Sequence, residues 1–216
     1  MTWAVDPHFE ELQQRVNARL VEIGSPAARE QADDYPWLYG ALGKVPAKVM
    51  FICETPSLAP IRRDNRRASD EGPSGIDKQW WGGVKNPACK RFRGALCETG
   101  LKTTPPSSEG GWECYITNVI KEASIAGHQE ARGSGGRLLQ ARQWADLLAW
   151  QLDEVSPRHV FGVGGAAQSL IRGLQAESRL PRFFVHEVCH YSDRGKGRTD
   201  EQVRADMIAA IGRALG

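Results

Sequence analysis

Five residues of this sequence could do chemistry together, because each follows a short run of residues typical of a buried strand. Glu54, Asn118, Gly164, Gly165 and His190 lie at the ends of four such runs. The carboxyl ends of strands in an open parallel sheet meet at one crevice, where ligands bind. A carboxylate can position or deprotonate water, a carboxamide both donates and accepts hydrogen bonds, and an imidazole can donate to a developing anion. The glycines permit a tight turn beside that crevice. We therefore expect a polar site at this edge.

Four strands and five helices are predicted to position these residues. Strands are expected over Val49–Ile52, Glu113–Ile120, Arg158–Gly165 with its turn, and Arg182–Val185, and helices over Pro7–Ile23, Ala88–Glu98, Arg137–Val155, Ala166–Leu174 and, capped by Asp200, up to Leu215. This alternation implies right-handed crossovers and helices on both faces of a parallel sheet. The prediction is an α/β fold, a three-layer α/β/α sandwich with a central four-stranded parallel sheet. A single domain is expected over residues 1–216, with an N-terminal helix and connection over 1–47.

Composition limits the function classes. The 216 residues are 41% hydrophobic and 25% charged, enough for one full core. No apolar run approaches the ~20 residues that cross a bilayer, so we expect a cytoplasmic monomer without membrane contacts. The five cysteines form no C-x-x-C pair and no zinc-type cluster with histidine, so reduced thiols and no metal are expected. The net charge of +2 is too small to indicate nucleic acid, so only local clustering of basic residues could do so.

Basic and aromatic residues gather in the long polar stretch over residues 57–87. Loops of this length inside compact domains are usually functional or disordered. Guanidinium groups pair with phosphate and indole rings offer a flat face to bases, so the stretch could engage nucleic acid; a solvated basic loop with core tryptophans explains it equally well. The candidates are Arg62, Arg63, Arg66, Arg67, Trp80 and Trp81. Lys90, Arg91 and Arg93 are expected on the solvated outer side of the helix over 88–98.

Three motifs together resemble the uracil-DNA glycosylase superfamily. They are C-E-T-P-S from Cys53, Y-I-T-N-V-I-K from Tyr115 and H-Y-S from His190. Members of the family pair a G-E-x-P-G or G-x-x-P-G turn after the first strand with an asparagine that closes a later strand and a late H-P-S turn. The middle motif is the most specific, because it matches members with T-N-V-V-K. The resemblance extends from about Val49 to Ser192.

The resemblance implies a role for each motif. A glycosylase flips its target nucleotide into a pocket, where Asn118 would read the polar edge of a pyrimidine. Glu54 would position or deprotonate the attacking water, and His190 would donate to the departing base, a role worth about 2.7–4 kcal/mol. The candidates for an aromatic ring that stacks on the base are Trp80, Trp81 and Phe92, although Phe92 is also expected to point inward from its helix. The groups expected to hold DNA phosphates are Pro56, Ser57, Gly164, Gly165, Ser192, Arg194, Lys196 and Arg198.

The implied function is a monofunctional DNA glycosylase that hydrolyses the N-glycosidic bond of uracil or another altered pyrimidine. DNA would be its partner, and neither metal nor another cofactor is expected. The sequence departs from the family at Cys53 and Ser57, where members have glycine, and at Tyr191, where they have proline. The long arginine-rich stretch and the altered turn allow a bulkier substrate, such as a hypermodified pyrimidine in phage DNA, and the resemblance allows a role in defence as well as in repair. The alternative is a catalytically silent member that binds DNA or a protein, in which the polar residues at the strand ends are structural.

Overall fold

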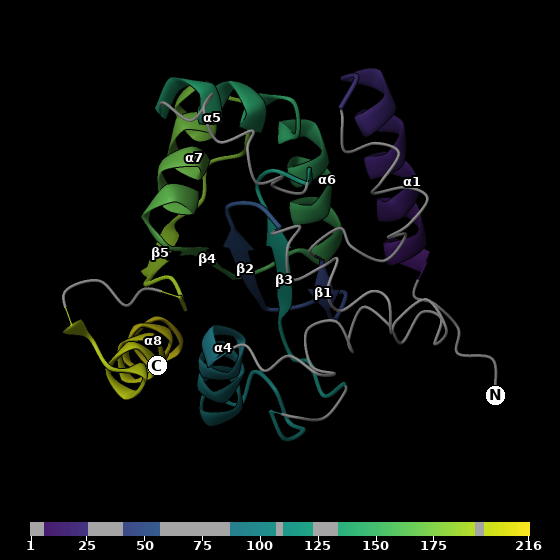
Figure 1. The fold of residues 1–216 in the computed structure, drawn as a ribbon. Helices are drawn as coiled ribbons and strands as arrows, with labels where there is room; N and C mark the ends of the chain where they lie inside the picture. The colour runs from purple at the N-terminus through teal and green to yellow at the C-terminus, as the bar shows by residue number, and fades with distance from the viewer. Residues whose placement is uncertain (1–6, 26–40, 57–86, 107–109, 123–133, 193–196) are drawn as a thin grey trace.

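The computed structural model describes residues 7–25, 41–56, 87–106, 110–122, 134–192 and 197–216 (Figure 1). The helices are α1 (Pro7–Glu22), α4 (Pro87–Glu98), α5 (Ser134–Arg142), α6 (Ala145–Val155), α7 (Gly165–Ala176) and α8 (Asp200–Leu215). The strands are β1 (Leu42–Gly43), β2 (Val49–Cys53), β3 (Tyr115–Asn118), β4 (His159–Val163) and β5 (Val185–Val188). The fold is α/β, as the alternation in the sequence predicts. None of the described helices has both the length and the apolar composition needed to span a membrane.

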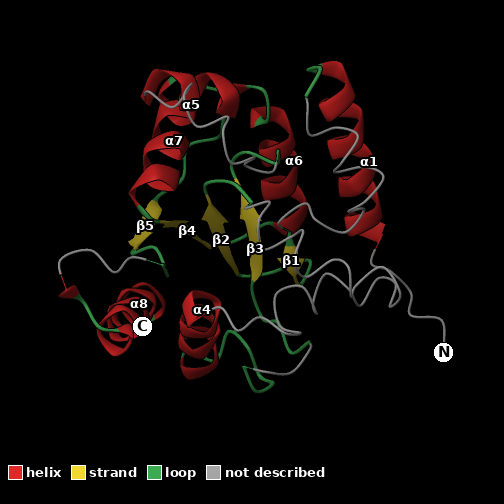
Figure 2. Ribbon diagram, in the orientation of Figure 1, coloured by secondary structure: helices red, strands yellow, loops and turns green. Residues whose placement is uncertain are grey.

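The five strands form one mostly parallel sheet in the order β1-β3-β2-β4-β5 (Figure 2). β2 lies at the centre and pairs in parallel with β3 and β4, and β5 pairs in parallel with β4. The register places Cys53 opposite Asn118 and Val163 opposite Val188. Because these four strands run in the same direction, their carboxyl ends lie along one edge of the sheet. We call this edge the rim: the ends of β2, β3, β4 and β5 and the residues that directly follow them.

Apolar side chains cover both faces of the sheet. Met50, Ile52 and Tyr115 pack against α1, α5, α6 and α7 on what we call the α6 face. Phe51 and Cys53 pack against α4 and α8 on the opposite face, the α4 face. Figure 1 shows α4 and α8 together on one side of the strands and the remaining helices on the other. Neighbouring strand residues point to opposite faces, so a central strand needs apolar residues throughout, and all five residues of β2 are buried.

Helix α8 begins with a capping box. The Thr199 hydroxyl oxygen accepts a hydrogen bond from the Gln202 backbone N–H at 3.2 Å, and the Gln202 side-chain oxygen accepts one from the Thr199 N–H at 2.8 Å. Two backbone donors at the helix start are thereby satisfied. The predicted cap, Asp200, is therefore wrong by one position. It is the first residue of the helix, where a carboxylate interacts favourably with the helix dipole.

The structure differs from the prediction in three further elements. The sheet has a fifth strand, β1, which pairs antiparallel with β3 and is too short for a periodic signal. The helix expected over 137–155 is two helices, because the backbone N–H groups of Gln143 and Trp144 bind carbonyls three residues back, at 3.1 and 3.0 Å, and Trp144 is buried between the helices. The last strand begins at Val185, where its prediction ended, because pairing with β4 selects the segment.

Helix α4 is covered on two sides, by the sheet and by α8. Lys90 is exposed, but Arg91 and Arg93 are only 5% and 2% exposed, so the prediction of a solvated outer side is wrong for both arginines. A side chain added at Gly94 would lie 3.0 Å from the Arg204 guanidinium of α8, which shows how closely the two helices approach. The arginines beside this contact are therefore removed from solvent.

A chain of buried polar side chains crosses the α6 face. Lys121 Nζ donates to the Thr117 hydroxyl at 2.7 Å, and that hydroxyl donates to the Gln151 side-chain oxygen at 3.2 Å. The Gln151 amide nitrogen donates to the Tyr115 hydroxyl at 2.7 Å, and this hydroxyl shares a hydrogen bond of 2.8 Å with His8 Nε2. The buried polar chain thus connects the segment after β3 with β3, α6 and α1.

Candidate functional site

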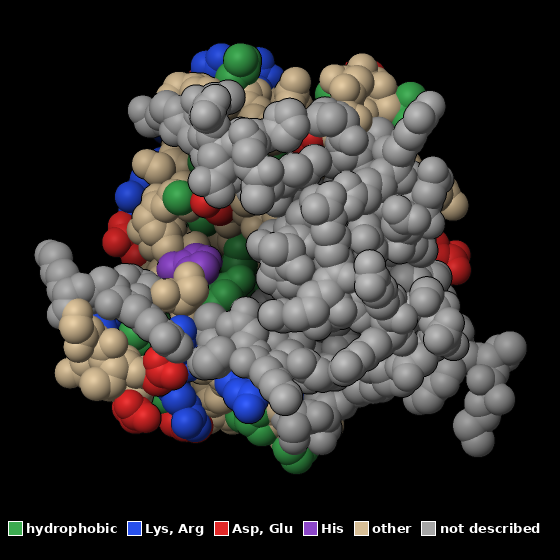
Figure 3. Space-filling model, in the orientation of Figure 1, with side chains coloured by type: hydrophobic (Ala, Val, Ile, Leu, Met, Phe, Trp, Pro, Cys, Tyr) green, Lys and Arg blue, Asp and Glu red, His purple; other side chains and the backbone are tan. Residues whose placement is uncertain are grey.

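The rim brings together the groups that the sequence placed at the strand ends. Glu54 follows β2, Asn118 ends β3, Gly164 follows β4, and His190 comes two residues after β5. The sheet order makes these four strand ends contiguous. Figure 3 shows a histidine and an acidic side chain exposed in a hollow between the upper helices and the pair α4 and α8. Imidazole and carboxylate groups therefore face the same accessible space.

Glu54 and Asn118 leave the sheet toward opposite faces. Cys53 packs on the α4 face, so Glu54, the next residue, turns to the α6 face, where α5 lies. Thr117 bonds to a side chain of α6, so Asn118 turns to the α4 face. A ligand at the rim would therefore meet a carboxylate from one face of the sheet and a carboxamide from the other.

The Glu54 carboxylate is held in an ion pair. Nη1 of Arg137, in α5, lies 2.6 Å from Glu54 Oε1, and the two side chains are only 19% and 26% exposed, respectively. The Glu54 carbonyl accepts a hydrogen bond from the Ile120 N–H at 2.9 Å, and the neighbouring Thr55 hydroxyl donates to the Glu122 carbonyl at 2.8 Å. Backbone and side chain of Glu54 are thus both fixed, with one carboxylate oxygen engaged by a cation.

Asn118 is held by the lysine that ends its own motif. Asn118 is 6% exposed, and Lys121 Nζ donates to its backbone carbonyl as well as to the Thr117 hydroxyl. Lys121 is fully buried, and this burial lowers its pKa well below the usual range of lysine. The T-N-V-I-K motif therefore has a local physical meaning: its lysine folds back and closes the turn that fixes the asparagine.

His190 packs directly on the turn after β4. A side chain at Gly164 would lie 2.9 Å from His190 Cβ and 3.3 Å from its Cδ2, so only glycine allows this approach. Gly164 also has φ +83° and ψ 155°, a conformation nearly restricted to glycine. Its N–H donates to the Val188 carbonyl at 2.8 Å, and the Gln168 amide donates to the same carbonyl at 3.2 Å. The imidazole is thus seated against β4 and α7.

Hydrogen bonding assigns the tautomer of His190. The Ser192 backbone N–H donates to His190 Nδ1 at 3.2 Å, and the Ser192 hydroxyl lies 2.5 Å from the same nitrogen. A ring nitrogen that accepts from a backbone N–H carries no hydrogen, so the hydrogen of the neutral ring is on Nε2. Nε2–H is therefore the hydrogen-bond donor of the neutral His190 ring.

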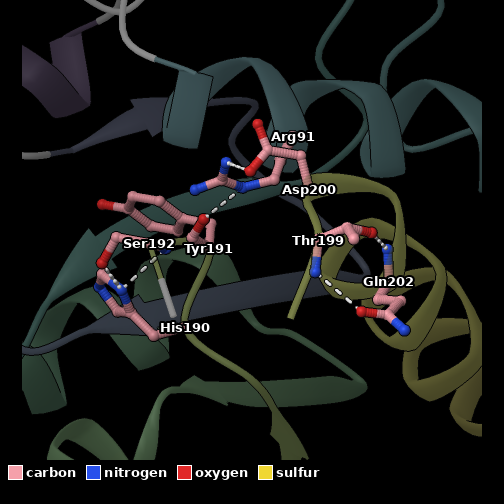
Figure 4. A network of polar contacts seen from close by, with 7 residues as sticks. All are labelled: Arg91, His190, Tyr191, Ser192, Thr199, Asp200 and Gln202. Carbon is pink, nitrogen blue, oxygen red and sulfur yellow. Dashed lines mark hydrogen bonds and ion pairs between the residues drawn. The ribbon is translucent and has the colours of Figure 1, made fainter. Parts of the chain in front are cut away.

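A clamp from α4 holds the turn that carries His190 (Figure 4). The Tyr191 ring stacks on the His190 ring, with centroids 4.3 Å apart, and on the Phe92 ring at 5.3 Å and 14°. Arg91 Nε donates to the Tyr191 carbonyl at 2.8 Å, and Arg91 Nη1 pairs with Asp200 at the start of α8. The tyrosine that departs from the H-P-S pattern thus joins the imidazole to both helices of the α4 face.

Two predicted features take on different roles. Phe92 is fully buried between Phe51 and Tyr191, so its ring is not available to stack on a base. The prediction that Phe92 points inward from its helix is confirmed. Tyr191, half-buried beside His190, is the aromatic ring that the described residues place at the rim. Cys53 stands where uracil-DNA glycosylases, which the motifs resemble, have glycine, and its side chain is buried in the core of the α4 face.

The remaining candidates for DNA contacts divide into two groups. Pro56 is buried, Gly165 begins α7 with open space around it, Ser192 is exposed, and Arg198 pairs with Asp206 of α8. Ser57, Arg62, Arg63, Arg66, Arg67, Trp80, Trp81, Arg194 and Lys196 lie outside the described residues. The described rim is therefore defined by Glu54, Asn118, Gly164 and His190, together with the residues that hold them.

Sequence reasoning missed the supporting residues. Arg137 follows a pair of glycines on an ordinary amphipathic helix, and no local pattern marks it as the partner of Glu54. Arg91 lies beside Gly94 and Ala95, and these small residues were the available signal that another helix packs closely on α4. The residues that hold the polar groups of the rim therefore come from segments that are distant in the sequence.

Within the described residues, no three His, Cys, Asp or Glu side chains lie close enough together to hold a metal ion. Comparison with known proteins adds no relative: no protein-family model matches the chain, and no curated protein is significantly similar to it. The function must therefore be argued from the rim itself.

Proposed function

We propose that this chain is a monofunctional DNA glycosylase that excises uracil or another altered pyrimidine by water attack. The observation that carries the proposal is the position of His190, whose Nε2–H is offered at the same rim as the Glu54 carboxylate and the Asn118 carboxamide. The resemblance of the three motifs at these positions to uracil-DNA glycosylases supports the same conclusion.

The proposed reaction divides its charges between the two sides of the rim. The flipped base is read by the Asn118 carboxamide on the α4 face, and His190 lies at the same rim. As the bond between the sugar C1′ and the base nitrogen breaks, its electrons pass to the base, and Nε2–H of His190 stabilises the resulting anion. Glu54, on the other face, stabilises the cationic sugar, orients a water and accepts its proton as the water oxygen bonds to C1′. The products are a free base and an abasic site.

The supporting residues bear on the substrate. Tyr191 places an aromatic ring beside the catalytic imidazole, at a position where related motifs have proline. The Cys53 side chain is buried in the core and therefore does not face a base at the rim. Space for a base is therefore bounded by a ring rather than by Cys53. We propose an altered pyrimidine in intracellular DNA, either uracil or a hypermodified base of phage DNA, so the biological role is repair or defence.

Excision tests this function directly. The protein is incubated with duplexes that contain uracil, other deaminated bases or hypermodified pyrimidines, and abasic sites are then cleaved with alkali. We expect strand breaks with at least one substrate, a loss of about 10²–10⁴-fold in rate for Glu54→Gln, and about 10²–10³-fold for His190→Ala. Matched controls are Glu113→Gln and His159→Ala, which change the same residue types toward the opposite end of the sheet and should retain the rate. Binding without strand breaks on every substrate would refute excision.

One observation favours the second candidate, a catalytically silent DNA-binding protein. Arg137 already engages a carboxylate oxygen of Glu54, and an ion pair attracts a cationic sugar less than a free carboxylate does. That candidate predicts that Glu54→Gln leaves the biological output unchanged.

A further inference from the structure

We propose that Arg137 exchanges partners, pairing with Glu54 in the free protein and with a phosphate of the DNA backbone in the complex. This inference rests on the proposed function and adds a residue that the catalytic motifs do not contain. The exchange would keep the Glu54 carboxylate neutralised until DNA is bound. It would also make Arg137 a phosphate contact at the flipped nucleotide.

The geometry of the pair suits an exchange. Arg137 contacts Glu54 through one nitrogen, Nη1, and one oxygen, Oε1, at 2.6 Å. Guanidinium binds phosphate through a planar fork of donors, and a single contact leaves that fork incompletely used. Arg142 of the same helix shows the alternative, because it holds Glu177 through both Nε and Nη2, at 2.8 and 2.5 Å. Arg137 is therefore the less firmly paired of the two arginines.

The position of Arg137 gives DNA access to it. Arg137 lies in the first turn of α5, directly after Gly135 and Gly136, both exposed, and nothing lies within 4 Å of a side chain placed at Gly135. Among the residues that the structure describes, no side chain therefore screens the approach of a phosphate past Gly135. The backbone N–H groups of a first helical turn add positive potential at the same point. The Arg137 side chain is 19% exposed, enough to be reached without unfolding the helix.

The chemistry of excision requires such a release. A carboxylate attracts a cationic sugar, but a guanidinium beside it cancels most of that attraction at distances longer than the ion pair. A backbone phosphate carries its own negative charge and binds the fork of arginine more completely than one carboxylate oxygen does. Binding of DNA would thus free Glu54 at the moment when its charge is needed.

The test is a double-mutant cycle on binding, with a probe that cannot be excised. The probe is a fluorescent duplex with a tetrahydrofuran abasic analogue, titrated with wild type, Glu54→Gln, Arg137→Gln and the double variant over a salt series. If Glu54 and phosphate compete for Arg137, Glu54→Gln should increase the affinity for the probe more in the wild-type background than in the Arg137→Gln background. The two increases should differ by a factor of about three to ten. Arg137→Gln should lower the slope of log affinity against log salt by about 0.9, the value for one phosphate contact.

Two further variants control for charge and folding. Arg142→Gln removes one positive charge from the same helix and should leave both the cycle and the salt slope unchanged, because Arg142 is paired away from the rim with Glu177. Arg137→Lys retains the charge without the fork and should restore the salt slope. Thermal midpoints of all variants should agree within a few degrees.

The outcomes separate this inference from the proposed function. Additive effects of the two substitutions with an unchanged salt slope would overturn the exchange, whether or not the protein excises a base. An intact cycle with no excision on any duplex would overturn the glycosylase function and leave Arg137 as a phosphate ligand. Failure of the wild-type protein to bind the probe would overturn both.

Discussion

Replacing Gly164 with alanine should both destabilise the protein and displace His190. Gly164 has φ +83° and ψ 155°, and such a conformation costs a residue with a side chain about 1–3 kcal/mol. The added carbon would lie 2.9 Å from His190 Cβ, although carbon atoms normally rest about 3.5–4.0 Å apart. The imidazole must therefore move by about half an ångström or more, or the turn must open.

The effect on stability follows from that cost. In a chain of this size, 1 kcal/mol shifts the thermal midpoint by about 2–4 °C, so we expect Gly164→Ala to lower it by about 2–12 °C. If the proposed function holds, displacement of His190 should also slow excision by up to about a hundredfold. Differential scanning calorimetry and single-turnover excision measure the two effects separately.

The next residue supplies the matched control. Gly165 begins α7 and has nothing within 4 Å of an added side-chain carbon, so Gly165→Ala should leave the midpoint unchanged or slightly raised. NMR of the His190 ring protons would show the displacement without reference to activity. Equal midpoints for the two alanine variants, with unshifted His190 resonances in both, would refute the assignment of Gly164 as the seat of His190.

Three other substitutions test the supporting residues. Arg91→Met should lower the free energy of unfolding by about 1.5–3 kcal/mol, because charge-assisted hydrogen bonds are lost, and Arg91→Lys should recover part of it; chemical denaturation measures both. Because burial lowers the pKa of Lys121, unfolding takes up protons at pH values between this lowered pKa and the usual lysine pKa of about 10.4, so the stability of wild type should rise relative to Lys121→Met as pH increases toward 10. Burial, with a contribution from His159, lowers the pKa of His186, so wild type should lose more stability than His186→Gln as pH falls below about 6.5; parallel curves in urea would contradict this.

Local patterns were sufficient for the scaffold of the site. The apolar run of β2 predicted a strand covered on both faces, and all five of its residues are buried. Strand ends then predicted which polar residues share an edge, because parallel pairing leaves little freedom in where Glu54 and Asn118 emerge. The two-residue β1 could not be predicted, because two residues carry no periodicity.

Long-range contacts account for what the sequence did not reveal. Arg91 was expected in solvent because its helix looked amphipathic, but α8 covers that side and Asp200 provides the counterion. The partner of Glu54 was equally invisible, because a surface arginine and a partly buried ion-pair partner have the same local pattern. When two other elements cover a helix, the sequence of that helix alone does not show which of its polar residues are buried.

The buried polar chain has a consequence for how α1 settles on the sheet. The apolar stripe of α1 repeats every four residues through Leu12, Val16 and Leu20, so a slide of the helix by one turn would present a similar hydrophobic surface to the same groove. Such a slide would break the bond between His8 and the Tyr115 hydroxyl and leave that hydroxyl with its bond from Gln151, and losing one partner of a buried polar group costs about 1–3 kcal/mol. Hydrophobicity brings α1 to this face, and one hydrogen bond selects a single alignment from several that apolar packing alone would leave nearly degenerate.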